Sequence, residues 1–229
     1  MKRLVLVISS ILCLTNCLTA QKGKTFIVNA GLRVEECIPF NERFRFPEFT
    51  AGKVTFKNGT ISQAKLNYNY VVSEMQFLQG KDTLSIANEK DILGIIIAGD
   101  IFIVNKGYLE LIFDDKVQVG IKQYFNLMDV RKKDPYGEIG SGAATDSYSS
   151  LHSNGQYNKL TVNQNRIFQM VSEYYLAASS REFVPFTKKK VMQLFPKNKT
   201  DIEDYLNSNK VDFDSRIDLV RFAEYLSKL

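Results

Sequence analysis

The chain has 229 residues, a formal net charge of +5, one histidine and three cysteines, and 45% of its residues are hydrophobic. A positive charge this small and this evenly spread argues against nucleic-acid binding. Two of the cysteines lie in the first 20 residues, and the third, Cys37, has no second cysteine to pair with if that segment is removed. The fold must therefore be held by its hydrophobic core, which a chain of this length can supply.

Residues 1–20 have the organisation of a secretory signal peptide. A basic start is followed by an apolar run over 4–14 and by a more polar stretch that ends at Ala20. An apolar run of about 7–15 residues and a small residue before the cut are typical of signal peptides. We therefore predict cleavage between Ala20 and Gln21, which gives an exported protein, periplasmic or secreted, with a net charge of +3.

Cys17 provides an alternative processing site. A lipid attached to this residue would make the chain an outer-membrane lipoprotein, but Asn16 is a poor residue immediately before a lipidated cysteine. We place this alternative second and an uncleaved anchor third. No later segment approaches the about 20 apolar residues of a membrane span, so we expect no transmembrane span in the mature chain.

Residues 21–130 have the pattern of an antiparallel β domain with one solvated face. Apolar and polar side chains alternate over 64–70, and Asn58-Gly59 has the sequence of a two-residue hairpin turn. The polar side chains that we expect on the solvated face are Lys65, Asn67 and Asn69.

Three details refine this domain. Ile61 is out of phase with the alternation that follows it, which predicts a bulge or a loose loop before Ala64. The apolar run over 92–97 predicts a strand buried on both faces. The segment 44–49 alternates aromatic with other residues and contains a proline, as an edge strand does. Short, evenly spaced strands favour a curled sheet or a small barrel.

The segment 131–164 is dominated by Gly, Ser, Asp, Asn and Thr, so we expect a long surface loop or linker. His152 lies in it. A catalytic imidazole needs a rigid site and an orienting partner, so we interpret His152 as a solvated loop residue.

Two segments follow the linker. The pattern of residues 165–186 predicts a β-hairpin that returns to the first sheet, and the pattern of residues 187–229 predicts a helical cap. We expect the cap helices to begin after Thr187, at a capping box over 200–203, and at Ser215. Three short amphipathic helices are not stable alone and must pack on the sheet. The predicted fold is α+β: a curled antiparallel sheet, or a small β-barrel or roll, followed by a C-terminal cap of about three short helices.

Few candidate catalytic or metal-binding residues remain. One histidine and one mature cysteine exclude zinc and copper sites of nitrogen and sulfur ligands, and we expect no cofactor. The acidic pairs Glu35-Glu36 and Asp114-Asp115 could join in a calcium site or a glycosidase-like pair. Adjacent acids on a strand point to opposite faces, however, and two aspartates before a lysine are typical of a turn.

Four tyrosines are candidates for an aromatic platform that binds sugar or peptide. Cross-strand and core packing explains them equally well. They are Tyr68, Tyr70, Tyr174 and Tyr175.

Short motifs mark the layout of the chain. They are the meander from Gly52-Lys53-Val54 to Asn58-Gly59, Asp82-Thr83-Leu84, the Gly/Ser/Thr linker, and Leu194-Phe195-Pro196 in the tail. With the signal peptide, this layout resembles uncharacterised exported proteins of Bacteroidota. None of these motifs carries catalytic or ligand-binding chemistry. The resemblance therefore implies a bacterial envelope location and no catalytic or ligand-binding residue.

These observations predict an exported, non-enzymatic binding or adaptor protein of the bacterial cell envelope, whose partner is an envelope protein or a glycan. One alternative is a carboxylate-based glycan hydrolase, which paired acids facing one cleft would favour. Another is a structural component of an envelope assembly that associates through the helical cap.

Overall fold

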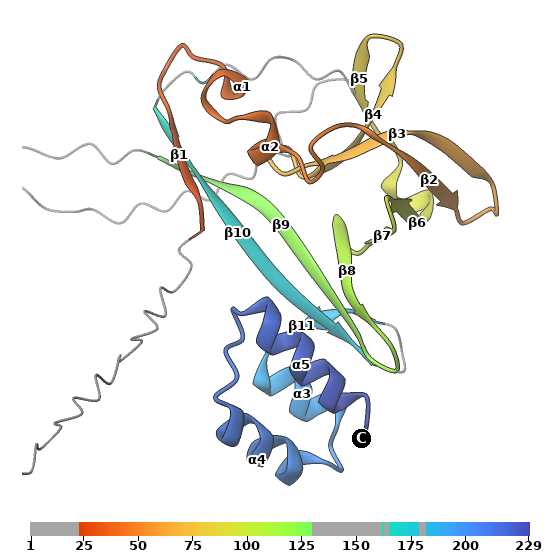
Figure 1. Ribbon diagram of the computed structural model, residues 1–229, viewed down its shortest axis with the longest axis vertical. Helices are drawn as coiled ribbons and strands as arrows, with labels where there is room; N and C mark the ends of the chain where they lie inside the picture. The colour runs from red at the N-terminus through yellow and green to blue at the C-terminus, as the bar shows by residue number, and fades with distance from the viewer. Residues whose placement is uncertain (1–22, 130–161, 163–164, 179–181) are drawn as a thin grey trace, which may run out of the picture.

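The computed structural model of the chain is shown in Figure 1. The residues that it describes are 23–129, 162, 165–178 and 182–229. Cys17, Ala20, Gln21 and His152 lie outside them, so the predictions about the signal peptide and the linker histidine stay predictions. No helix within these ranges combines the length and the apolar character needed to cross a membrane.

One antiparallel sheet dominates the structure. Its strands are β1 (Thr25–Val28), β2 (Thr50–Phe56), β3 (Ile61–Asn69), β4 (Glu74–Gln79), β5 (Asp82–Ser85), β6 (Ile92–Ile97), β7 (Asp100–Val104), β8 (Tyr108–Asp114), β9 (Gln118–Asp129), β10 (Arg166–Ala177) and β11 (Val184–Pro185). The spatial order is β1-β10-β9-β8-β7-β6-β2-β3-β4-β5, with β11 also paired to β10. The sheet is curled and not closed into a barrel (Figure 1), which confirms the α+β prediction in its curled-sheet form.

Short helices accompany the sheet, most of them towards the two ends of the chain. They are α1 (Val34–Cys37), α2 (Phe40–Arg43), the 3-10 turn η1 (Glu89–Asp91), α3 (Lys188–Leu194), α4 (Lys199–Asn209) and α5 (Arg216–Leu226). The sequence did not predict α1 and α2, because each is a single turn of four residues without a periodic apolar stripe.

The longest ladder joins β9 to β10 over 12 residues, from Asp129 paired with Arg166 to Gln118 paired with Ala177. On its other side β10 pairs with β1 near its start and with β11 near its end. The N-terminal segments lie at one end of this ladder and the cap of α3, α4 and α5 lies at the other (Figure 1).

The caps of two helices follow the sequence. Thr187 accepts a hydrogen bond from the Lys190 backbone N–H, and Ser215 accepts one from Asp218, so both predicted starts are confirmed. The capping box predicted over 200–203 is wrong. The N-cap of α4 is Asn198, which makes no side-chain cap, because the turn after Phe195 already brings Thr200 into the helix.

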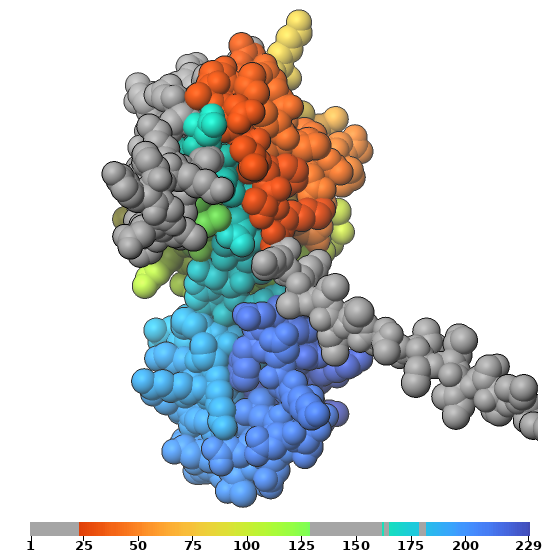
Figure 2. All heavy atoms as spheres, turned by 90° about the vertical axis from the view of Figure 1, so that its left-hand side faces the viewer, coloured from red at the N-terminus to blue at the C-terminus, as the bar shows by residue number. Residues whose placement is uncertain are grey.

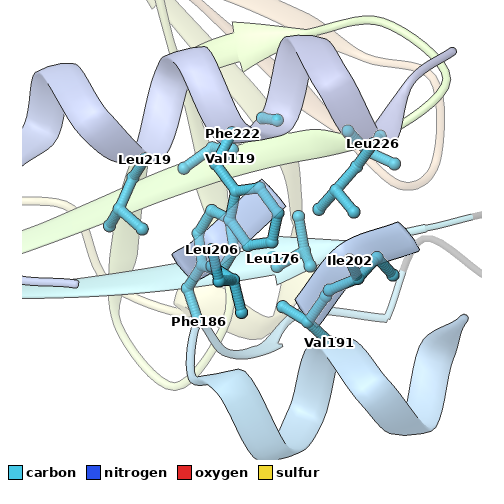
Figure 3. Close-up of a cluster of buried hydrophobic side chains, with 11 residues drawn as sticks. Val119, Leu176, Phe186, Val191, Ile202, Leu206, Leu219, Phe222 and Leu226 are labelled. Atoms are coloured by element: carbon cyan, nitrogen blue, oxygen red, sulfur yellow. The ribbon is translucent and has the colours of Figure 1, made fainter. Parts of the chain in front are cut away.

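The apolar faces of α3, α4 and α5 meet side chains from β9, from β10 and from Phe186, which directly follows β11, in one cluster (Figure 3). Phe222 of α5 lies within it, stacked 5.8 Å from Phe186 and 5.4 Å from Tyr205 between ring centroids. The buried members are Val117, Val119, Leu176, Phe186, Val191, Ile202, Leu206, Leu219, Phe222, Ala223 and Leu226.

The predicted burial of residues 92–97 on both faces is wrong. Leu93 and Ile96 are 61% and 45% exposed, because β6 presents one face to solvent. Ile92 and Ile95 are both buried since the register with β2 shifts between Thr55 and Phe56. A second register shift lies between β8 and β9, at Leu111 to Phe113. The bulge or loose loop predicted between Ile61 and Ala64 is absent: β3 begins at Ile61, and the register of the β2–β3 ladder is continuous.

Asn67 and Asn69 are fully buried, which corrects their predicted place on a solvated face. The Asn67 side chain accepts a hydrogen bond from the Phe46 backbone N–H at 3.0 Å and donates one to the Phe46 carbonyl at 2.9 Å. A side chain therefore takes the role of a strand partner at this point. For the same reason 44–49 bends beside β3 and does not form the predicted edge strand; only Phe44 makes a bridge, with Asn69.

Replacing Phe222 tests the cap core. We expect Phe222→Ala to lower the free energy of unfolding by about 3–5 kcal/mol, because it removes a buried ring and leaves a cavity. Chemical denaturation measures the change. Ile217→Ala on the same helix is the control: Ile217 is 64% exposed and its removal should cost less than about 0.5 kcal/mol. Equal losses for the two variants would contradict the packing of α5.

Candidate functional site

A polar cleft of about 640 Å³ lies beside the middle of β10, between the N-terminal segments and the cap. Figure 2 shows β10 in cyan, crossing between the red and orange N-terminal segments and the blue cap. The residues that line the cleft are Gly23, Lys24, Asn41, Glu42, Phe44, Arg45, Tyr70, Ile121, Gln123, Met170, Val171, Ser172, Tyr174, Asp214 and Arg216.

The floor of the cleft is a polar break in an otherwise apolar strand face. Ser172 of β10 pairs with Gln123 of β9, and Gln123 Nε2 donates to Ser172 Oγ at 3.1 Å. Two residues away along β10, Met170 packs on the N-terminal cluster and Tyr174 packs on the cap cluster. The cleft therefore follows the seam between two hydrophobic clusters.

An ion-pair network fixes one wall. Arg45 Nε donates to Glu110 Oε2 at 2.6 Å, and its Nη2 donates to Glu110 Oε1 at 3.0 Å and to Asp100 Oδ2 at 2.8 Å. The Glu110 side chain is only 7% exposed. The hydrogen bond to Glu110 raises the pKa of Arg45 in spite of partial burial. Arg45 is thus permanently charged, and three of its five N–H donors bind two carboxylates.

The other wall belongs to the cap. Arg216 is the first residue of α5, and its Nη2 lies 3.9 Å from Glu110 Oε1, which is an ion pair too long for a hydrogen bond. Its side chain is 52% exposed. Glu110 therefore lies between the two walls. It accepts hydrogen bonds from Arg45 and forms a longer ion pair with Arg216.

Two of the four candidate tyrosines reach the cleft. Burial raises the pKa of Tyr70 to about 12, against the opposing effect of the Arg45 charge, and it also raises the pKa of Tyr174. Tyr68 is buried and donates to the Gln123 carbonyl at 3.2 Å. Tyr175 lies on the opposite face of β10, where its hydroxyl donates to Glu173 Oε2 at 2.8 Å. The structure does not bring the four into one platform.

The predicted acidic pairs do not meet. Glu35 and Glu36 lie in α1 beside β1, at the end of the β9–β10 ladder that is far from the Asp114-Asp115 turn. A ladder of this length spans roughly 40 Å at about 3.3 Å per residue. Asp114 Oδ1 accepts from Gln118 Nε2 at 2.6 Å, as in ordinary turn chemistry. Among the described residues, no three His, Cys, Asp or Glu side chains gather to hold a metal.

The carboxylates that do line the cleft are Glu42 and Asp214, and a third, Glu110, lies behind Arg45. Sequence reasoning missed all three. Lys24 Nζ donates to both oxygens of Glu42, at 2.7 and 2.8 Å. The sequence contained one indication that Arg45 has a special environment, because this residue stands between aromatic residues. Its guanidinium does lie 5.0 Å from the centroid of the Phe46 ring, but its hydrogen bonds go to acids on β7 and β8.

Removing Glu110 tests the network. We expect Glu110→Leu to lower the free energy of unfolding by about 3 kcal/mol, because it leaves the partly buried Arg45 without its main partner. The double variant Arg45→Met, Glu110→Leu should recover part of this loss. Urea denaturation of the single and double variants gives the coupling energy.

The matched control for this experiment is Glu203→Gln. Glu203 pairs with Lys188 at 3.8 Å on the exposed surface of the cap, where an ion pair contributes about 0–1 kcal/mol. A Glu110 variant as stable as the Glu203 variant would contradict a structural role for the network.

Comparison of the chain with protein-family models, with curated proteins and with solved structures found no match. The resemblance to exported proteins of Bacteroidota therefore stays a prediction. The function has to be inferred from the residues of the cleft themselves.

Proposed function

We propose that this chain is an exported, non-enzymatic binding or adaptor protein of the bacterial cell envelope, and that its ligand is a glycan held in the polar cleft. The observation that carries the proposal is the lining of the cleft, which combines two tyrosine rings with neutral hydrogen-bonding side chains. Its volume of about 640 Å³ falls in the range of about 300–1,000 Å³ that is usual for small-molecule sites.

The chemistry of the lining favours a ligand rich in hydroxyl groups. Most small-molecule sites are mainly apolar with few polar groups. In this cleft Asn41, Gln123 and Ser172 offer uncharged donors and acceptors, while Tyr70 and Tyr174 offer ring faces with a polar end. A sugar presents hydroxyl groups around its rim and C–H groups on its faces, so it complements both kinds of side chain.

The occupied carboxylates favour binding over hydrolysis. A glycosidase needs one carboxyl group to protonate the leaving oxygen and a second to act as base or nucleophile. Both oxygens of Glu110 accept from Arg45, and both oxygens of Glu42 accept from Lys24. Among the described residues of the cleft, Asp214 is then the one carboxylate outside a close ion pair.

The packing of the cap favours a role inside the fold over a role in assembly. Leu219, Phe222 and Leu226 of α5 bury their side chains against the sheet. The apolar stripe of α5 is thus already used within the chain, and the cap serves as one wall of the cleft.

Glycan binding is tested with the mature chain from Gln21 and a panel of envelope oligosaccharides, measured by isothermal titration calorimetry. We expect Tyr174→Ala to weaken binding by about tenfold or more, because it removes a ring face that contacts the sugar. The neighbouring Tyr175→Ala, on the opposite face of β10, should bind as the parent does. Thermal unfolding of both variants separates loss of contact from loss of fold.

Two outcomes of this experiment would contradict the proposal. Equal effects of the two tyrosine variants would place any ligand elsewhere. Cleavage of an oligosaccharide, abolished by Asp214→Asn or Glu42→Gln, would favour the hydrolase alternative.

Export is tested by the N-terminus of the natively expressed chain, read by mass spectrometry after cell fractionation. We expect a start at Gln21 in the soluble envelope or secreted fraction, because the segment before it has the organisation of a signal peptide. A lipid on Cys17 in the membrane fraction would support the lipoprotein alternative. A full-length chain in the cytoplasm would contradict export.

A further inference from the structure

Arg216 differs from the other cations of the cleft in the state of its donors. Lys24 is engaged by Glu42, and Arg45 makes three hydrogen bonds to Glu110 and Asp100. Arg216 donates no hydrogen bond within the part of the chain that the structure describes. A guanidinium has five N–H donors, so Arg216 keeps its full capacity to bind an acceptor.

Glu110 orients Arg216 by its charge and does not accept a hydrogen bond from it. The two groups are 3.9 Å apart, and both Glu110 oxygens already accept hydrogen bonds from Arg45. A carboxylate that enters the cleft therefore faces a cation that is held in place electrostatically but is free to form hydrogen bonds. Such charge-assisted bonds are about twice as strong as neutral ones, and a guanidinium can bind a carboxylate through two of them.

Arg216, Tyr70 and Tyr174 all line the same cleft. Burial raises the pKa of Tyr70 and of Tyr174, and the Arg216 charge lowers the pKa of each in opposition to burial. One ligand can therefore contact the guanidinium and a tyrosine ring at the same time.

We propose that the cleft binds an acidic oligosaccharide, in which the carboxylate of a uronic acid residue pairs with Arg216 while a sugar ring lies against Tyr70 or Tyr174. This inference rests on the proposed function and names the substrate class of the same cleft. Asp214 also lines the cleft and is exposed, so it disfavours a densely charged chain. The preferred ligand is one in which uronic acid residues alternate with neutral sugars.

The sheet argues against a peptide as the occupant. Peptides commonly bind a sheet by adding a strand to a free edge. β10 is paired with β9 along its whole length, and on its other side it pairs with β1 at 166–169 and with β11 at 175–176. Among the described strands, the gap left beside the cleft is only a few residues long. Recognition there depends on side chains, as it does for sugars.

The test uses the mature chain and two probes that differ in one group. The first probe is an oligosaccharide in which glucuronic acid alternates with a neutral hexosamine. The second is the same oligosaccharide with each carboxyl group reduced to an alcohol. We expect calorimetry to show about tenfold or stronger binding of the acidic probe, because only that probe pairs with Arg216.

Three variants assign the preference to Arg216. Arg216→Gln should remove the difference between the probes, and Arg216→Lys, which keeps the charge but not the paired donors, should retain part of it. Arg221→Gln changes a second arginine of α5 that does not line the cleft, and it should keep the full preference. Because Arg216 is half exposed at the start of α5, its replacement should leave the fold intact, which thermal unfolding checks.

The outcomes separate this inference from the function on which it rests. Equal binding of the two probes, or a preference that survives Arg216→Gln, would contradict the proposal that Arg216 binds an acidic ligand. Neither result would contradict glycan binding by the cleft. Failure of both probes and of the whole oligosaccharide panel overturns both. Tighter, Arg216-dependent binding of a peptide with a free C-terminal carboxylate would contradict a glycan ligand. It would still support the pairing of Arg216 with a carboxylate.

Discussion

The antiparallel ladder between β9 and β10 is the constraint on which the rest of the structure depends. Its two ends carry the N-terminal cluster and the cap cluster, and its polar centre, Gln123 with Ser172, belongs to neither. Because both clusters are attached to the same pair of strands, the cleft between them has a fixed floor. The position of the proposed binding site is thus a consequence of where the apolar row of this ladder is interrupted.

Buried polar side chains shape the wall opposite the cap. The amide of Asn67 replaces a backbone partner at Phe46, which bends the segment that carries Arg45. Arg45 in turn bonds to Glu110, a residue 65 positions away. Groups that are buried and fully hydrogen-bonded are costly to disturb, so they hold this wall more rigidly than apolar contacts alone would. Arg216, across the cleft, is left with its donors free for a ligand.

Local signals in the sequence predicted local structure well. The caps at Thr187 and Ser215 need only a hydroxyl and a backbone N–H three residues later, so the sequence contains all of the information. The burial of Asn67 and the Arg45–Glu110 pair depend on partners from distant segments, which periodicity does not specify. The exposed face of residues 92–97 is not specified by the sequence, because a run of apolar residues does not show that one face is left to solvent.

The most direct test of the account is a map of the surface that the ligand contacts. Backbone amide resonances of isotope-labelled protein, followed during titration with the alternating uronic acid oligosaccharide, should shift around the cleft, at Tyr70, Ser172 and Arg216. On the opposite face of the sheet, Tyr124 of β9 donates to Glu173, as Tyr175 does. Shifts confined to that face, at Tyr124 and Tyr175, would contradict the assignment of the cleft as the binding site.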